Sequence, residues 1–200
     1  MKPILILYAT REGHTEKVCA HISESLRARA QAVELRDVRE LPREFSLDRY
    51  AAAILAASVH VGRHEGAMVK FVTRARAQLE RLPTAMLTIC LTEATIEDES
   101  KPAELRQQAS EELAGIMERF YETTGWHPDR AQPVAGALMY REYGLIVRWM
   151  MRRIARSTSG DTDTSRNHVY TDWDALDHFV EDFIQTVEPA NQSAEAAPRA

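Results

Sequence analysis

A short apolar strand that runs directly into a hydroxyl-rich turn constrains this chain more than any other feature. The strand is residues 4–8, and the turn at residues 10–15 (TREGHT) follows it and opens a helix. Unpaired backbone N–H groups and the helix dipole at such a helix start both favour an anion. The hydroxyls of Thr10 and Thr15 add further donors. The sequence therefore predicts a phosphate site at residues 10–15.

The spacing of this turn matches neither of two common phosphate motifs. No Gly-Lys-Ser/Thr follows, as a P-loop requires, and the G-x-G-x-x-G fingerprint of dinucleotide-binding folds is absent. The Thr-x-x-Gly-x-Thr pattern after a first strand instead resembles the flavodoxin phosphate loop, which holds the monophosphate of FMN. An ordinary strand–helix turn is the alternative. Flavodoxins normally have a hydroxyl where this chain has Glu12, and a carboxylate there would repel the phosphate. We therefore expect Glu12 to turn outward or to pair with Arg11.

Composition and charge set the broad class. At 200 residues, with 44% hydrophobic and 28% charged residues, the chain is expected to form one globular domain. The net charge of −5 gives no reason to expect nucleic acid as a partner. Cys19 and Cys90 lie far apart among apolar neighbours, so we expect both to be buried and unpaired in a reducing compartment. No secretory signal and no long apolar span are visible, which predicts a cytoplasmic protein.

Strand and helix patterns alternate almost from end to end. This alternation predicts an α/β fold, a doubly wound five-stranded parallel sheet with helices on both faces. Three loops should then converge on a ligand at the carboxyl ends of the strands: residues 10–15, 58–65 and 91–101, with 92–101 as a polar loop. The predicted strands are residues 4–8, 32–38 (at or near a sheet edge), 51–57, 85–91 and 134–138, and the predicted helices are residues 15–30, 66–82, 102–124 and 171–187.

One segment does not fit this plan. Residues 140–168 lie between the fifth strand and the last helix, far more than an ordinary connection needs, and they are too apolar to be disordered. We predict a domain over residues 1–187 with a helical insert at 140–168. The tail at residues 188–200, rich in Ala, Pro, Ser and Gln, is predicted to be disordered.

The insert contains an amphipathic, cationic stretch at residues 143–156. One helical face is apolar and another carries arginines, which is typical of a helix lying on anionic lipid. The alternative is that this helix packs on the domain or on a second subunit of a homo-oligomer. The apolar face is Tyr143, Ile146, Val147, Met150 and Ile154, and the basic face is Arg148, Arg152 and Arg156.

Further segments resemble the menaquinone-dependent protoporphyrinogen oxidase family, flavodoxin-like bacterial enzymes of haem synthesis. The similar segments are residues 57–64 (ASVHVGRH), 126–130 (WHPDR), 135–140 (AGALMY), 159–164 (SGDTDT) and 169–173 (VYTDW). The resemblance implies FMN-dependent oxidation of protoporphyrinogen IX to protoporphyrin IX, with a membrane quinone as electron acceptor. It also implies an oxidoreductase peripheral to the cytoplasmic face of the inner membrane.

The resemblance and the predicted loops together give a set of site residues. Positive charge at residues 58–65 would stabilise a reduced, anionic flavin. Guanidinium groups would bind the two propionates of the substrate. The expected cofactor-binding residues are Thr10, Arg11, Glu12, Gly13, His14, Thr15, Ser58, Val59, His60, Gly62, Leu91, Thr92 and Glu93, and the expected substrate ligands are Arg63, His64, Arg141 and Arg148.

Some roles stay open at this level. His60 and His64 are candidates for a general base, but neither is assigned as catalytic. Asp161 and Asp163 could suggest a metal, but helix capping or pairing with a nearby arginine is favoured over a metal site. Two other functions fit the same features: a flavodoxin-like electron-transfer protein whose insert serves a protein partner, and a generic FMN quinone reductase with a different donor.

Overall fold

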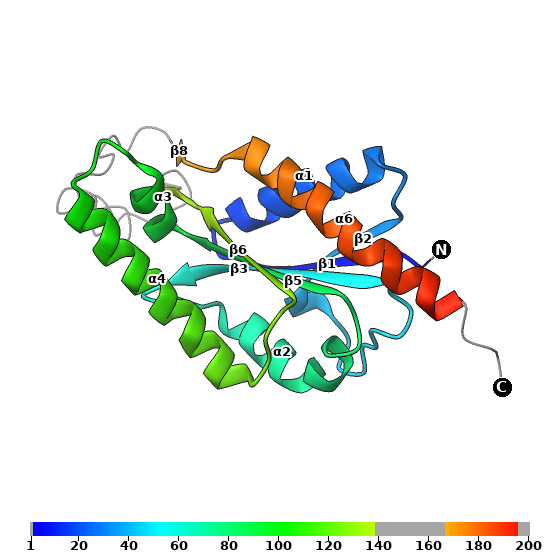
Figure 1. Ribbon diagram of the computed structural model, residues 1–200. Coiled ribbons are helices and arrows are strands. Elements are labelled where there is room, and N and C mark those ends of the chain that lie inside the picture. Colours follow the sequence, from blue (N-terminus) through cyan, green and yellow to red (C-terminus); the bar gives the residue numbers. More distant parts are fainter. Residues whose placement is uncertain (1, 139–166, 196–200) are drawn as a thin grey trace.

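The computed structural model describes residues 2–138 and 167–195, with backbone only for residues 188–195. Its centre is a parallel sheet with the strand order β2-β1-β3-β5-β6 (Figure 1). This order confirms the predicted doubly wound five-stranded sheet, and β2 lies at an edge as expected. The strands are β1 (Ile4–Ala9), β2 (Val33–Asp37), β3 (Ala52–His60), β5 (Thr84–Cys90) and β6 (Arg130–Ala135).

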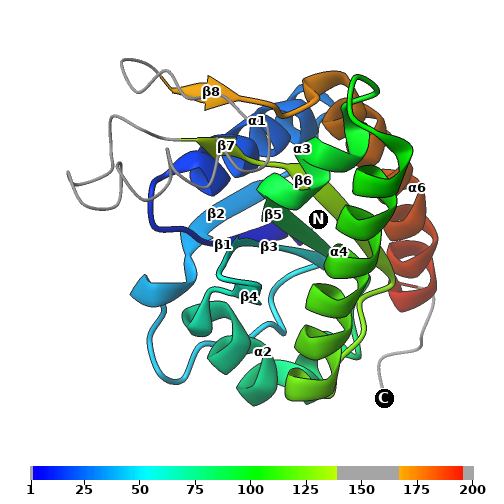
Figure 2. The same cartoon turned by 90° about the vertical axis from the view of Figure 1, so that its left-hand side faces the viewer.

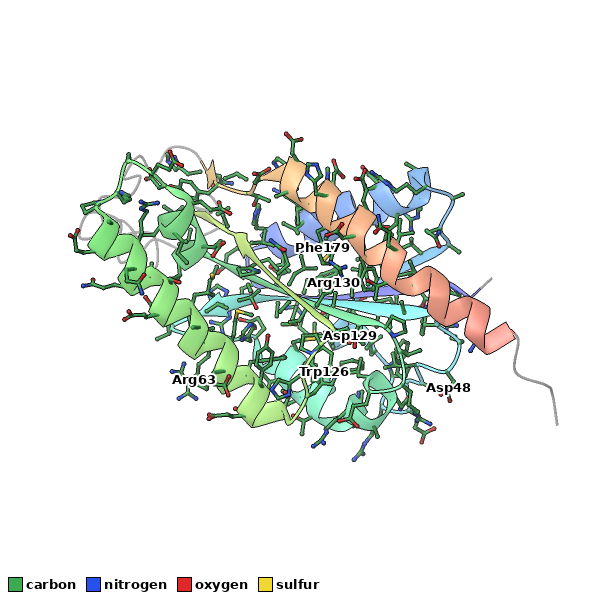
Figure 3. The ribbon with its side chains drawn as sticks, in the orientation of Figure 1. Asp48, Arg63, Trp126, Asp129, Arg130 and Phe179 are labelled. Atoms are coloured by element: carbon green, nitrogen blue, oxygen red, sulfur yellow. The ribbon has the colours of Figure 1, made fainter. Side chains whose placement is uncertain are left out.

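Helices cover both faces of the sheet, as Figure 1 shows with the sheet seen edge-on. Side chains alternate across each strand, so Ile4 and Ile6 of β1 pack in one core while Leu5 and Leu7 pack in the other. Phe179 and Trp126 are large members of these two cores, on opposite sides of the sheet (Figure 3). The first core is closed by α1 (His14–Ala28) and α6 (Trp173–Glu195), and the second by α2 (Gly66–Leu79) and α4 (Ala103–Thr124).

The segment predicted as a loop at residues 58–65 is instead a β-hairpin. Strand β3 continues to His60, the chain turns at Val61 and Gly62, and β4 (Arg63–His64) returns antiparallel to β3. Both turn residues have positive φ, 50° for Val61 and 67° for Gly62. This is the backbone of a two-residue hairpin turn, whose twist matches that of the flanking strands.

Two further predictions need correction. Residues 92–101 do not form a plain loop, because Leu91–Glu97 form the short helix α3. Leu, Glu and Ala in this stretch favour helix, and Glu93 complements the dipole of its first turn. The last helix does not end at Val187 but continues to Glu195, through Pro189.

The fifth predicted strand is interrupted at Gly136. Strand β6 ends at Ala135, and β7 (Ala137–Leu138) leaves the main sheet to pair antiparallel with β8 (His168–Val169). A short 3-10 helix, η1 (Val38–Glu40), follows β2. Within residues 2–138 and 167–195, none of the helices is long and apolar enough to cross a membrane. Cys19 and Cys90 are buried and unpaired, as predicted.

Candidate functional site

The site lies where the strand order reverses, at the carboxyl ends of β1 and β3. The chain moves from β1 outward to β2 and then returns to β3 on the other side of β1. In doubly wound sheets, the crevice at such a switch point takes the ligand. Figure 2 looks onto this edge, with β4, α3 and the β7–β8 pair around it.

The first loop is shaped by Thr10 and Gly13. The side-chain oxygen of Thr10, itself buried, accepts a hydrogen bond from the Gly13 N–H at 3.1 Å. Gly13 has a φ of +81°, which glycine adopts without the strain that a side chain would bring. Gly13 also precedes α1, and no side chain in the described part of the chain caps that helix start. The amides at this helix start are thus left for a ligand.

Thr15 supplies an unpaired hydroxyl in the first turn of α1. Its exposed fraction is 0%, and its Oγ1 has no hydrogen-bond partner among the described residues. Leaving a buried hydroxyl unpaired costs about 1–3 kcal/mol. A phosphate oxygen is an acceptor that this hydroxyl could satisfy, so the residues of the loop fit the monophosphate of FMN.

His14 fastens the first loop to the far end of the chain. The Thr171 hydroxyl donates to the Ala135 carbonyl oxygen at 2.7 Å. That hydroxyl has one proton, so the 2.7 Å bond between His14 Nε2 and Thr171 Oγ1 must have His14 as its donor. The second nitrogen, Nδ1, is then an acceptor, buried and without a partner in the described structure. Burial, and to a lesser extent Lys17, lowers the pKa of His14 to about 4, so the ring is neutral.

A chain of charged groups joins the first loop to the hairpin. His60 Nε2 lies 3.4 Å from Glu12 Oε2 and 3.7 Å from Glu65 Oε1, and Arg11 Nε lies 2.6 Å from Glu65 Oε1. The expected pairing of Glu12 with Arg11 is therefore wrong. The hairpin brings His60 and Glu65 to the loop, so each charge of the first loop finds its partner in the second segment.

His64 packs against β5 and α4. It is buried, its Nε2 lies 2.9 Å from Thr88 Oγ1, and its ring packs on Phe120 with 4.6 Å between centroids. Burial disfavours the charged form and lowers its pKa to about 4. His64 is thus a buried, neutral ring in this structure, and its expected substrate-binding role stays a prediction.

The hairpin as a whole is less basic than its sequence suggests. His64 is neutral, His60 lies between two carboxylates, and only Arg63 remains as an exposed cation of residues 58–65. Arg63 lies beside α4 (Figure 3), and Arg119 of that helix donates to the Gly62 carbonyl oxygen at 2.7 Å. The positive charge that this hairpin places near the flavin site is thus smaller than the sequence predicts.

The third predicted loop enters the site as the first turn of α3. Leu91, Thr92 and Glu93 follow β5 directly and are half-buried. Burial and then the neighbouring Glu97 raise the pKa of Glu93. The backbone of Gly136 packs against this turn, with its N–H donating to the Cys90 carbonyl oxygen at 2.8 Å.

Sequence reasoning missed three contributors to the site. Thr171 lies at the predicted start of the last helix, where Asp172 caps α6 by accepting from the Ala175 N–H, and the Thr171 oxygen instead accepts from His14. Glu65, next to the predicted start of α2, was not singled out, although an acid beside a cationic loop is a visible signal. Glu97 follows Glu93 by one helical turn, a spacing that becomes informative once residues 91–97 are seen as a helix.

Several predicted residues cannot be placed. Arg141, Arg148, Asp161 and Asp163 lie in residues 139–166, outside the described residues, as does the amphipathic stretch 143–156. The tail residues 196–200 also lie outside them. In the part of the chain that is described, no group of three or more His, Cys, Asp or Glu side chains is arranged to hold a metal ion.

Comparison with known proteins defines the class. The Flavodoxin domain family model matches residues 5–165, and the chain belongs to this family. Membership indicates FMN as the cofactor, in agreement with the phosphate loop described above. A solved structure, the rubredoxin oxygen:oxidoreductase of Desulfovibrio gigas, shares the fold with a TM-score of 0.51 at 12% identity. The match covers 98% of this chain and 38% of that one.

The curated relatives are more specific. A protoporphyrinogen IX dehydrogenase (quinone) of Escherichia coli is 27% identical over 176 residues, which are 88% of this chain and 91% of the relative. A protein of the same name from Leishmania major is 27% identical over 183 residues, 90% of this chain and 73% of the relative. These relatives confirm the family resemblance inferred from the sequence.

Proposed function

We propose that this chain is an FMN-dependent oxidoreductase that oxidises protoporphyrinogen IX to protoporphyrin IX and passes the electrons to a membrane quinone. The observation that carries the proposal is the buried Thr15 hydroxyl at the sheet's switch point, which has no partner among the described residues. It lies in a chain that aligns over 88% of its length with an enzyme of that activity. A phosphate site alone would fit many flavoproteins. The names of the relatives are what points to a porphyrinogen as the substrate.

The residues of the chain supply binding and orientation. The hydroxyl of Thr15 and the amides after Gly13 would hold the phosphate, and the ends of β3 and β5 would flank the ring. Bound FMN would supply the two-electron chemistry. The loop fold imposed by Thr10 exists before the cofactor arrives, which lowers the entropic cost of binding it.

The substrate side of the proposal rests on arginines. Arg63 is exposed at the hairpin and could pair with one propionate of a tetrapyrrole. Arg141 and Arg148 remain proposed partners for the propionates. We also propose that residues 143–156 bind the cytoplasmic face of the inner membrane, where a quinone dissolved in lipid is within reach. Packing of this stretch on a second copy of the chain is the alternative.

One observation favours a second function, that of a flavodoxin-like electron carrier. The hairpin holds two carboxylates around His60 and a neutral His64, so the positive charge that would favour a dehydrogenase is smaller than expected. The carrier would exchange electrons with a protein partner and would not act on a porphyrinogen. A generic FMN quinone reductase would accept electrons from another donor.

Anaerobic turnover separates these functions. Purified protein loaded with FMN is mixed with protoporphyrinogen IX, with or without a quinone in detergent, and protoporphyrin is followed by its fluorescence. We expect porphyrin to form only when a quinone is present. If no porphyrin forms while a flavodoxin reductase reduces the bound flavin readily, the protein is a carrier. Reduction of quinone by another donor alone would indicate the generic reductase.

Membrane binding is tested separately. Sedimentation with vesicles that contain anionic lipid should be lost when Arg148, Arg152 and Arg156 are all changed to glutamine. Unchanged sedimentation of this triple variant would remove the membrane proposal and leave the flavin chemistry untouched.

A further inference from the structure

Glu12 is a carboxylate in the loop that would hold the FMN phosphate, and among the described residues the imidazole of His60 faces it. Glu12 Oε2 lies 3.4 Å from the Nε2 of His60, which belongs to the end of β3. The same nitrogen lies 3.2 Å from Ser58 Oγ and 3.7 Å from Glu65 Oε1. The imidazole therefore spans the crevice between the two segments that flank the cofactor site.

Within the cluster of Arg11, Glu12, Glu65 and His60, the charges balance only when His60 carries a proton. Glu65 also pairs with Arg11, so the cluster has one guanidinium and two carboxylates, and neutral His60 leaves it with one negative charge. The side chains of Glu12, Glu65 and His60 are 22%, 14% and 24% exposed, so solvent screens them only in part. Two further cations are near: Arg63 opposite His60 in the hairpin, and Arg39 of η1, which interacts with Glu65.

We propose that protonated His60 is the counter-ion that allows a carboxylate in the first loop to coexist with a phosphate dianion. The inference rests on the FMN cofactor of the proposed function and adds a positioning residue to it. With His60 protonated, the carboxylate of Glu12 is compensated and the phosphate meets no net repulsion. With His60 neutral, Glu12 carries an uncompensated charge into the phosphate site.

Thermodynamic linkage predicts the direction in which FMN affinity changes with pH. If a proton on His60 favours the dianion, then binding of the dianion favours the proton, so FMN binding takes up a proton. FMN affinity should therefore fall as the pH rises and the proton on His60 is lost. The phosphate of FMN also titrates near neutral pH, so the informative quantity is the difference between the wild type and a variant that lacks the imidazole.

The first experiment compares two ligands in three proteins. Apoprotein is titrated with FMN and with riboflavin, which lacks the phosphate, and flavin fluorescence gives each Kd. We expect His60→Gln to weaken FMN binding roughly tenfold, the size of one partly screened charge at close range. Riboflavin binding should change less than about twofold. The matched control, His178→Gln on the exposed side of α6, should leave both Kd values unchanged.

The second experiment removes the charge that His60 compensates. The double variant Glu12→Gln with His60→Gln should bind FMN within about twofold of the wild type, because the repulsion that His60 offset is gone. Circular dichroism and thermal melting establish that each variant is folded, and Glu12→Gln alone should bind FMN at least as tightly as the wild type. Calorimetry in two buffers of different ionisation enthalpy should detect proton uptake on FMN binding in the wild type and less in His60→Gln.

Three results would overturn the inference. These are equal losses for FMN and riboflavin in His60→Gln, a double variant as weak as the single one, or proton uptake that is the same with and without the imidazole. Failure of the wild type to bind FMN would overturn it as well. If the predicted dependence on His60 is found but porphyrinogen is not oxidised, only the proposed substrate is wrong.

Discussion

The first loop and the hairpin flank the same crevice, yet their structures were predictable to different degrees. The backbone of the loop at residues 10–15 has the conformation that its sequence indicates, with a glycine at positive φ directly before the start of a helix. The hairpin at residues 58–65 does not behave as its sequence indicates, because its function depends on charge. Charge is set by what packs against each side chain, and those neighbours come from distant parts of the chain. A prediction that depends on the backbone conformation of a motif is therefore more reliable than one that depends on the charge state of its side chains.

The largest expected effect tests the charge state of the hairpin. The pKa of His64 falls from 6.5 to about 4 in the folded protein because of burial. A lowered folded pKa means that the unfolded chain binds the proton more tightly, so stability is retained above pH 6.5 and lost as the pH falls toward 4. His64 alone should remove about 3 kcal/mol of unfolding free energy over that range.

Urea unfolding at pH 7 and pH 4.5 measures this loss, and His64→Gln is the comparison. The variant should lose less stability on acidification than the wild type. An identical pH dependence in both proteins would mean that His64 is not held neutral, and the hairpin would then be as basic as its sequence suggests. His14, whose pKa is also lowered, contributes in both proteins and cancels in the comparison.

The next effect belongs to the first loop. Thr15→Val replaces the buried hydroxyl, which has no partner in the described part of the chain, with a methyl group of similar size. We expect FMN affinity to fall by roughly 10–100-fold, since a hydrogen bond to a charged group contributes about 1.5–3 kcal/mol. The apoprotein should become more stable by about 1 kcal/mol, because an unsatisfied donor is removed. Fluorescence titration and thermal melting give the two quantities, and a loss of both would show that the hydroxyl is bonded within the apoprotein.

A pair of glycine variants compares the two segments directly. Gly13 and Gly62 have φ values of +81° and +67°, and at neither position does an atom of the described residues lie closer than 3.8 Å to an added Cβ. Changing either to alanine should cost about 1–2 kcal/mol through left-handed backbone strain alone. Only Gly13→Ala should also weaken FMN binding markedly, because its backbone shapes the phosphate loop. Equal effects on FMN binding would mean that the hairpin turn contacts the cofactor as closely as the loop does.

The smallest expected effect is an increase in the stability of the protein. Val61 is 98% exposed and has a φ of 50°, an unfavourable backbone for a β-branched residue. Val61→Asn should raise the unfolding free energy by about 1 kcal/mol, since asparagine is favoured at this turn position and no packing is lost. Urea unfolding checks this gain. If catalysis by the variant is unchanged, the strained valine serves neither stability nor turnover.

The same difference between backbone and charge separates what could be predicted from the sequence in the rest of the molecule from what could not. Apolar strands such as residues 51–57 are buried on both faces, and such a run is typical of a strand inside a parallel sheet covered by helices. The sheet and its helices were therefore predictable. The helix at Leu91–Glu97 was not, because its polar residues resemble a loop until its packing against α4 is known. The charge partners of Glu12 were not either, since His60 lies 48 positions away in a hairpin that local propensity does not specify.

The bond between His14 and Thr171 also has a consequence for how the site forms during synthesis. It joins residues 157 positions apart, and it completes the first loop with a group from the end of the domain. A nascent chain that has emerged only as far as β5 contains the entire phosphate motif but neither Ala135 nor Thr171, which hold His14 in place. We therefore expect stable cofactor binding only after the segment that contains Thr171 has left the ribosome.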